Sequence, residues 1–445
     1  MTTYPSPPQC HVLPGGLCVL IEPLPYAHSV SVGCFVGVGA GHEERHESGI
    51  AHFIEHMLFK GTQRRPSPKM IVDAIEGVGG ILDAYTSFES TVYYAKVADI
   101  YFDRAIDALS DMLISPRFDP LDVEKERRVI AEELHQTEDT PAELVHLLLD
   151  AAMWGDQPLG RDIAGSEETI AAFTVEQIVS FWRTHYTRRN MVISIAGHVD
   201  VQRALEAVAA AFDALPEGMP GICLPSQPPL PGPALTLRRD DNEQGNFCIG
   251  FRGIAYDDSD RRALLALDTV IGGGPSSRLF QEIREERGLA YNIGSYSREH
   301  HDTGKWVVFG SVEPPNLHEC LATVMAELRR VRHEGITADE LAQVKEQVKG
   351  GILLSLEDTW AIASRNGSHQ LRYGRVIPIE QVVAEVETVL LEDVLRVAQR
   401  VLRDEHLHMA VIGPYADAAD FEELLTVEHA SQVPKRRVQS AKKAL

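Results

Sequence analysis

The stretch SGIAHFIEHMLFK, residues 48–60, has the pattern of a short amphipathic helix that carries two histidines with a glutamate between them. Its apolar residues recur at the spacing of a buried helical stripe, and they are Ile50, Phe53, Ile54, Met57 and Leu58. At about 100° per residue, His52, Glu55 and His56 fall together on the opposite arc. Ser48 is the expected N-cap, because a serine hydroxyl can accept a hydrogen bond from a free N–H of the first turn. The sequence therefore predicts a helix that buries one face and presents three polar side chains on the other.

The polar trio has the residue types and the spacing of a zinc site. Histidines at positions i and i+4 lie one above the other on a helix, so His52 and His56 can both present an imidazole nitrogen to one Zn²⁺ ion. Glu55 lies on the same side but one position away from this pair, as a general base acting on metal-bound water must. A lone helical histidine is more often a core or surface residue with a satisfied hydrogen bond. The order His-x-x-Glu-His, however, is the inverzincin motif, and it indicates metal-assisted hydrolysis.

A third ligand is expected in EKERRVIAEEL, residues 124–134. Glu126 and Glu133 are seven positions apart, about two helical turns, so both project from one face of the same helix. Without the histidine motif, these glutamates would be interpreted as part of a solvated helix face. Glu132 competes with Glu133 as the inward residue, and periodicity alone does not choose between them.

The chain of 445 residues is longer than one hydrophobic core usually grows, so we expect two domains. The segment 216–233 contains seven prolines and no helical or strand periodicity, which is typical of a semi-rigid linker. We therefore predict a catalytic zinc-binding domain at 1–215 and a homologous domain at 234–445. The same order of elements recurs in both: apolar strands at 30–40 and 246–256, strand regions at 79–97 and 288–312, and long helices at 118–134 and 336–353. The predicted fold class is α+β, with a mainly antiparallel sheet flanked by helices in each domain.

The composition indicates which kinds of partner the protein can bind and where in the cell it is expected. A formal net charge of −23 repels phosphate backbones, so nucleic acid is not expected as a partner and a cationic peptide is favoured. No apolar run is long enough to span a bilayer, and the first 44 residues contain neither Lys nor Arg. We therefore expect no membrane segment, no signal or transit peptide and a cytoplasmic location. Six cysteines without ligand spacing are expected to be reduced thiols. The basic segment 434–445 is expected to be a solvated chain end.

The two motifs together resemble the pitrilysin family of zinc endopeptidases, which includes insulin-degrading enzyme. The family pattern is His-x-x-Glu-His followed, after 76 intervening residues, by a glutamate, and this spacing leads from His56 to Glu133. The form GIAHFIEHMLFKGT and the chain length are similar to the single-subunit branch, that of the β subunit of mitochondrial processing peptidase. The resemblance implies one Zn²⁺ per chain held by His52, His56 and Glu133, with Glu55 as general base and Glu126 supporting the site without binding the metal.

The resemblance also implies roles for residues outside these two helices. In REERGLAY, Arg284 and Tyr291 are similar to the arginine and tyrosine that family members bring across the chamber to hold the substrate backbone. Taken alone, they are a helix-end arginine and a strand-start tyrosine. In the family's edge strand, which pairs with the substrate peptide, GGILDAYTS has Asp83 where asparagine is usual, so the side-chain contact with substrate is left open. The long glycine-rich loop of the non-catalytic processing-peptidase subunit is missing, because IGGGPSS is short.

These observations predict a zinc-dependent endopeptidase that hydrolyses unfolded, extended and preferably basic peptides. The two domains are expected to close as a clamshell around a chamber, and the chain is expected to form a dimer with itself or with a related subunit. The alternative is a non-catalytic or regulatory subunit of a processing-peptidase-like complex. Such subunits lose parts of the zinc motif, whereas all four motif residues are present here. A purely structural zinc site is disfavoured, because a fourth protein ligand would normally close it.

Overall fold

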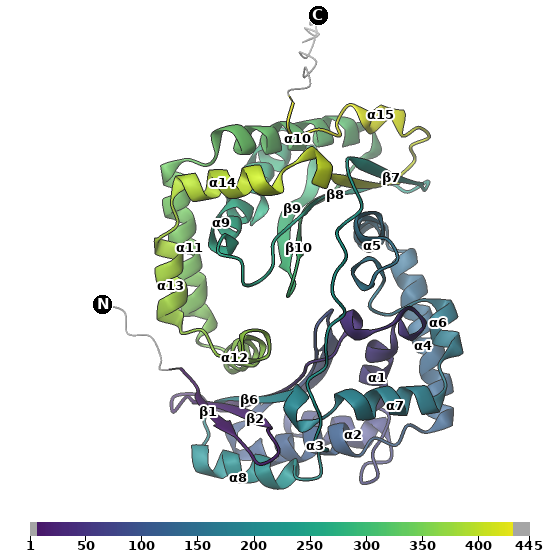
Figure 1. The fold of residues 1–445 in the computed structure, drawn as a ribbon, viewed down its shortest axis with the longest axis vertical. Coiled ribbons are helices and arrows are strands. Elements are labelled where there is room, and N and C mark those ends of the chain that lie inside the picture. The colour runs from purple at the N-terminus through teal and green to yellow at the C-terminus, as the bar shows by residue number, and fades with distance from the viewer. Residues whose placement is uncertain (1–6, 430–445) are drawn as a thin grey trace, which may run out of the picture.

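The computed structural model describes residues 7–429, so the basic segment 434–445 lies outside the described part of the chain. Two β-sheets form its framework, one in the lower half of Figure 1 and one in the upper half. The segment 216–233 has neither helix nor strand and runs from the lower half to the upper half. No helix in the described part combines the length and the apolarity needed to cross a membrane.

The two sheets share one topology, except that the first has an additional edge strand, β1. The first has the strand order β1-β2-β6-β3-β5-β4, and the second has the order β7-β11-β8-β10-β9. The strands of the first sheet are β1 (Gln9–Val12), β2 (Cys18–Pro23), β6 (Met191–Gly197), β3 (Ser29–Val36), β5 (Thr91–Ala98) and β4 (Ile81–Thr86). Those of the second sheet are β7 (Ala234–Arg239), β11 (His408–Gly413), β8 (Gly245–Arg252), β10 (Gly304–Val312) and β9 (Ala290–Glu299). Among these strands, the pairs β2–β6 and β7–β11 are parallel and the other neighbours are antiparallel. When β1 is left out, the parallel pair therefore occupies the same place in both sheets.

The helices follow the strands in a similar order in each half. The first half contains α1 (Ile50–Leu58), α2 (Pro68–Ile75), α3 (Phe102–Ile114), α4 (Pro120–Glu138), α5 (Pro141–Trp154), α6 (Glu167–Ala172), α7 (Val175–His185) and α8 (Val201–Ala211). The second half contains α9 (Arg261–Gly272), the π-helical segment η7 (Phe280–Glu286), α10 (Leu317–Glu334), α11 (Ala338–Ser355), α12 (Thr359–Tyr373), α13 (Ile379–Glu387), α14 (Leu391–Val401) and α15 (Ala419–Glu422). The long helices predicted at 118–134 and 336–353 are α4 and α11.

β3 is buried on both faces, and its alternate residues belong to different apolar clusters. Val30, Val32 and Cys34 join the core that contains residues of α1 and α3. Phe35 points to the opposite face, where it packs with Trp360 of α12. Burial on both sides explains why this strand shows a nearly continuous apolar run instead of alternation.

The two halves exchange one helix each. α12 of the second half lies against β2, β3 and β6 of the first sheet, as Figure 1 shows. Trp360 of α12 stacks on Tyr94 of β5 with ring centroids 3.8 Å apart. Gly367 permits the close approach, because a Cβ there would lie 2.2 Å from the ring of Phe35. In the other direction, α5 of the first half packs on β7, β8 and β11 of the second sheet. Each sheet is therefore completed by a helix from the other half.

The predicted fold class is confirmed: two mostly antiparallel sheets are flanked by helices and repeat one order of elements. The exchange of α5 and α12 was not predicted, because it depends on contacts between residues far apart in the chain.

Candidate metal centre

α1 begins at Ile50, but not with the cap expected from the sequence. Its N-cap is Gly49, whose φ of 95° lies in the left-handed region that glycine adopts without strain. Glycine has no side chain that could accept a hydrogen bond from the first turn of the helix. The prediction that Ser48 caps the helix is therefore wrong. Instead, the carboxylate of Glu43 accepts hydrogen bonds from the N–H groups of Gly49 at 2.8 Å and Ala51 at 2.9 Å. A negative charge is favourable at a helix N-terminus, so Glu43 performs the role expected of Ser48.

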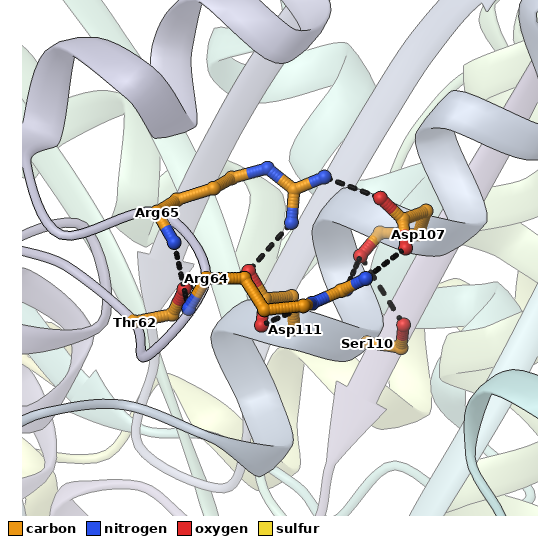
Figure 2. A network of polar contacts seen from close by, with 6 residues as sticks. All are labelled: Thr62, Arg64, Arg65, Asp107, Ser110 and Asp111. Carbon is orange, nitrogen blue, oxygen red and sulfur yellow. Dashed lines mark hydrogen bonds and ion pairs between the residues drawn. The ribbon is translucent and has the colours of Figure 1, made fainter.

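A polar network fixes the chain just after α1, and Figure 2 shows it from close by. The hydroxyl of Thr62 donates to Asp111 of α3 at 2.6 Å and accepts from the N–H of Arg65 at 2.8 Å. The guanidinium groups of Arg64 and Arg65 each form ion pairs with both Asp107 and Asp111. Because Asp111 is buried, these donors offset the cost of taking its charge out of water. The loop that leaves α1 is thereby held on α3, and the helix is fixed at both ends.

The side chains of His52 and His56 on α1 converge on Glu133 of α4. Oε2 of Glu133 lies 3.6 Å from Nε2 of His56 and 3.9 Å from Nε2 of His52. The possible ligand atoms of the three residues lie within 4.8 Å of one another, and residues 7–429 contain no other such group of three His, Cys, Asp or Glu. Glu132, the competing candidate, is exposed. The structure thus brings Glu133, and not its neighbour, to the two histidines.

Glu126 holds His56 from the side opposite Glu133. Its Oε2 lies 3.2 Å from Nδ1 of His56, and its Oε1 lies 2.7 Å from Nζ of Lys60. Burial alone would raise the pKa of Glu126, but the bonds to His56 and Lys60 bring it below its ordinary value. Burial would likewise lower the pKa of His56, but the bond to Glu126 and the carboxylates of Glu133 and Glu55 raise it. With Nδ1 engaged by a carboxylate, Nε2 of His56 is the nitrogen directed at Glu133.

The carboxylate of Glu55 has a partner on β4. The hydroxyl of Thr86, the last residue of that strand, donates to Oε2 of Glu55 at 2.6 Å. Burial raises the pKa of Glu55 above its ordinary value, although the bond from Thr86 and the charge of His56 oppose the shift. A carboxylate with a raised pKa accepts a proton more readily near neutral pH, which is the property a general base requires.

The donor set fits a catalytic zinc ion. Two imidazole nitrogens and one carboxylate oxygen are ligands that such zinc sites use, and they leave a fourth coordination position open. Burial, together with the nearby His56, lowers the pKa of His52 to about 4, so this ring is neutral near pH 7 and has a lone pair for a metal.

Arg284 and Tyr291 lie against each other on the second half of the chain. Arg284 belongs to the π-helical segment η7, and its Nη1 donates to the carbonyl of Tyr291 at 3.0 Å. Its guanidinium carbon also lies 4.5 Å from the centre of the Tyr291 ring. Tyr291 is 79% exposed. In residues 7–429 neither residue forms a hydrogen bond or ion pair with the histidines or Glu133, so their role across the chamber stays a prediction.

Asp83 lies on β4, which forms one edge of the first sheet. Its carboxylate accepts hydrogen bonds from the hydroxyl of Tyr94 at 3.2 Å and from the N–H of Ala84 at 2.8 Å. The free main-chain groups of this edge are of the kind that an extended peptide can pair with.

Two residues of the site were not assigned a role from the sequence. Glu43 occurs in GHEERHESG, which has the composition of a polar loop, yet it is 1% exposed. Thr86 ends an edge strand, where threonine is common. Its contact with Glu55 is between residues 31 positions apart, so no local pattern in the sequence indicates it. Both residues act through contacts with α1 from other segments of the chain, and the spacing of apolar residues within a helix or strand does not predict such contacts.

The chain matches two protein-family models, which follow one another along the sequence. Residues 18–167 match the model described as insulinase, peptidase family M16, and residues 172–348 match the model described as the peptidase M16 inactive domain. The chain belongs to peptidase family M16, the insulinase family. The resemblance to the pitrilysin family stated from the sequence is therefore confirmed.

Individual relatives cover nearly the whole chain. An uncharacterized zinc protease of Bacillus subtilis is 35% identical over 401 residues, which are 90% of this chain and 96% of that protein. An uncharacterized zinc protease of Streptomyces coelicolor is 38% identical over 415 residues, 91% of this chain and 89% of that protein. Among solved structures, a protease from Helicobacter pylori matches with a TM-score of 0.85 at 22% identity, over 92% of this chain and 100% of that one. Complex III2 from Candida albicans contains a chain that matches with a TM-score of 0.79 at 18% identity, over 94% of this chain and 99% of that one. At these identities the two structures show the shared fold alone.

Proposed function

We propose that this protein is a zinc-dependent endopeptidase that hydrolyses unfolded peptides. The observation that carries the proposal is the convergence of His52, His56 and Glu133, with the carboxylate of Glu55 held beside them by Thr86. Membership of peptidase family M16 supports the same activity, as do the names of the relatives, which are zinc proteases.

In this proposal one zinc ion is held by His52, His56 and Glu133, and Glu126 orients the ring of His56. Zinc, when bound, supplies a Lewis acid that makes water nucleophilic at neutral pH and polarises the scissile carbonyl. Glu55 accepts the proton of the attacking water and returns a proton to the leaving amine.

Thr86 determines how Glu55 presents its carboxylate. Because the hydroxyl of Thr86 donates to Oε2, that oxygen is engaged and Oε1 is left for the proton of the water. The bond also connects the proton acceptor to β4, the strand that we propose binds the substrate backbone. A peptide added to this edge would be held by main-chain hydrogen bonds with loose sequence preference.

The rest of the chain completes the proposed active site. Residues 1–215 form the catalytic domain, residues 216–233 link it to the second domain, and residues 234–445 close the chamber. Arg284 and Tyr291 contact the substrate backbone from that second domain. The net charge of −23 makes basic peptides the better substrates. The cytoplasmic location and the dimer with itself or a related subunit stay predictions.

The test combines metal content with peptide digestion. The purified protein is dialysed, its zinc is measured by atomic emission, and a mixed peptide library is digested with and without a chelator. We expect about one zinc ion per chain and cleavage that the chelator abolishes. A protein that binds zinc but cuts no peptide would support the alternative of a non-catalytic subunit. A protein that binds no zinc would overturn the proposed function.

A further inference from the structure

Two cysteines face each other on β1, the additional edge strand of the first sheet, and on its neighbour β2. The sulfur atoms of Cys10 and Cys18 lie 3.9 Å apart, and both residues are free thiols. No other two cysteines of residues 7–429 form such a contact. Figure 1 shows the two strands at the lower left. Joining the sulfurs needs an approach of about 1.9 Å, which rotation of the side chains can supply.

The register of the hairpin places both thiols on one face. Cys10 pairs with Leu20, and Val12 pairs with Cys18, so the two cysteines are diagonal neighbours across antiparallel strands. Diagonal neighbours on one face of a sheet lie within reach of each other. Their separation of eight positions is not the spacing of a metal-binding or redox motif, so the sequence alone does not indicate the pair.

The two thiols differ in their access to solvent. Cys10 is exposed, whereas Cys18 is partly buried and packs against the apolar cluster that contains Phe35. Burial, followed by the charge and the hydrogen bond of Cys10, raises the pKa of Cys18 to about 12. The thiolate is the reactive form of cysteine. Cys18 therefore stays a thiol near pH 7, and Cys10 is the sulfur that a small oxidant meets first.

β1 has little else to hold it in place. Its strand pairing is limited to four residue pairs with β2, and three of its four side chains are exposed, with Val12 at 69%. When β1 opens, β2 loses the partner of its outer edge, although it carries the buried apolar residues Val19, Leu20 and Ile21. An unpaired apolar edge is a template for pairing with another chain. A covalent bond between the two strands would keep this edge covered.

We propose that Cys10 is a site of reversible oxidation and that Cys18 is its resolving thiol, so that a hydroperoxide locks β1 onto β2 through a disulfide. The inference goes beyond the proposed function, because β1 lies at the opposite edge of the sheet from β4. A disulfide that forms only under oxidising conditions is the kind expected of a thiol pair in a reducing compartment.

The reaction balances with hydrogen peroxide as the oxidant. The thiolate of Cys10 attacks one peroxide oxygen, the O–O bond breaks, and the other oxygen leaves as hydroxide and takes up a proton to become water. Cys10 is then a sulfenic acid. The sulfur of Cys18 attacks the sulfur of Cys10, the S–O bond breaks, and hydroxide leaves with the proton of Cys18 as a second water. Each sulfur loses one electron and each peroxide oxygen gains one, and a dithiol reductant reverses the change.

The test treats the whole purified protein with hydrogen peroxide and then alkylates the remaining thiols. Peptic digestion without reductant and mass spectrometry locate the bond. Pepsin is required because residues 1–44 contain neither Lys nor Arg, so trypsin leaves both cysteines on one peptide. We expect a disulfide between Cys10 and Cys18 that dithiothreitol removes. Two unreacted thiols, a sulfinic acid on Cys10 or a disulfide between two chains in its place would overturn the proposal.

Three serine variants assign the roles of the two thiols. Cys18→Ser should hold Cys10 as a sulfenic acid that dimedone traps, and Cys10→Ser should leave Cys18 unoxidised at the same peroxide dose. Cys223→Ser is the matched control, because Cys223 is also partly buried but its sulfur donates to the carbonyl of Gly41 at 3.3 Å. This control should form the disulfide as the parent does. Oxidation of Cys18 in Cys10→Ser as fast as in the parent would show that Cys10 is not the site of attack.

Hydrogen exchange tests the consequence for β1 and needs no cysteine variant. The amides of Gln9–Val12 should exchange more slowly in the oxidised protein by on the order of tenfold to a hundredfold, because a short closed loop removes chain entropy from the opened strand. The amides of β4 are the internal control and should not change. Equal exchange of β1 in the two forms would overturn the lock. All these measurements can be made on Glu55→Gln, so failure of the proposed function would leave this inference untouched.

Discussion

Glu55 and Glu133 are glutamates beside the same two histidines, yet their surroundings differ. Glu55 bonds to Thr86 and burial raises its pKa, whereas Glu133 is 42% exposed at its side chain and points its Oε2 at both Nε2 atoms. The surroundings of Glu55 favour a proton acceptor, and those of Glu133 favour a metal ligand.

Glu55→Gln is expected to keep zinc and to lose peptide hydrolysis. The amide cannot accept a proton from water, but the three candidate ligands are unchanged. General base catalysis contributes about 10²- to 10⁴-fold, so kcat should fall by at least about a hundredfold. Zinc content by atomic emission and kcat on one peptide check the prediction, and activity above about a tenth of the parent's would contradict the role of Glu55.

Glu133→Gln is expected to lower zinc occupancy far more than Glu132→Gln does. The two variants make the same change at neighbouring positions, but only Glu133 approaches the histidines, while Glu132 is exposed. Metal content after dialysis measures the difference. Equal occupancy in the two variants would remove Glu133 from the ligand set.

The residue pattern allowed part of this site to be predicted. His52, Glu55 and His56 lie on one helix, so their spacing alone places them on one face. The choice of Glu133 over Glu132 came from the family spacing, because helical periodicity alone did not decide which of these two neighbours faces inward. Glu43 and Thr86 could not be found in this way, since each acts through a contact with α1 from another element.

Among the secondary-structure elements, α1 depends on a buried carboxylate for its start. Burial, the main cause, raises the pKa of Glu43 from 4.5 to about 7, although the N–H groups of Ala51 and Gly49 oppose the shift. Because the folded-state pKa lies above the unfolded value, the folded protein binds more protons than the unfolded chain between these two pH values. This group's contribution to the free energy of unfolding should therefore fall as pH rises from about 4.5 to about 7.

The comparison with Glu43→Gln tests this expectation in metal-free protein. The variant does not titrate, so its difference from the parent in free energy of unfolding should change by on the order of 1–3 kcal/mol across that range. Urea denaturation at a series of pH values measures the difference. Parallel curves for the two proteins would show that Glu43 does not control the pH dependence.

The sequence predicted the helices and strands themselves better than it predicted which of them pack against each other. β3, α4 and α11 were expected from apolar runs and helical periodicity, which are local signals. The packing partners of α5 and α12 were not predicted. An amphipathic pattern shows which face of a helix is buried, but it does not show which sheet covers that face.

In the whole molecule, the second half is expected to take part in substrate binding. If Arg284 and Tyr291 hold the substrate as proposed, Arg284→Ala and Tyr291→Phe should each lower kcat/KM on one peptide by about tenfold or more while zinc content stays unchanged, because each variant would lose a contact made in the transition state. Arg287→Ala is the control, since Arg287 pairs with Glu282 in the same segment. If both variants hydrolyse the peptide as fast as the parent, the second half does not contribute to the active site.

The exchange of helices has a consequence for the order in which the protein is made. The last strand of the first sheet ends at Gly197, but α12, which covers one face of that sheet, begins at Thr359. At translation rates of about 5–20 residues per second, roughly 8 to 30 seconds pass between their appearances. During this interval the side chain of Phe35 and its neighbours lack their cover, so a nascent chain stalled before α12 leaves the ribosome should be digested by protease more readily than one stalled after it. Equal resistance of the two nascent chains would show that the first sheet folds without waiting for its helix.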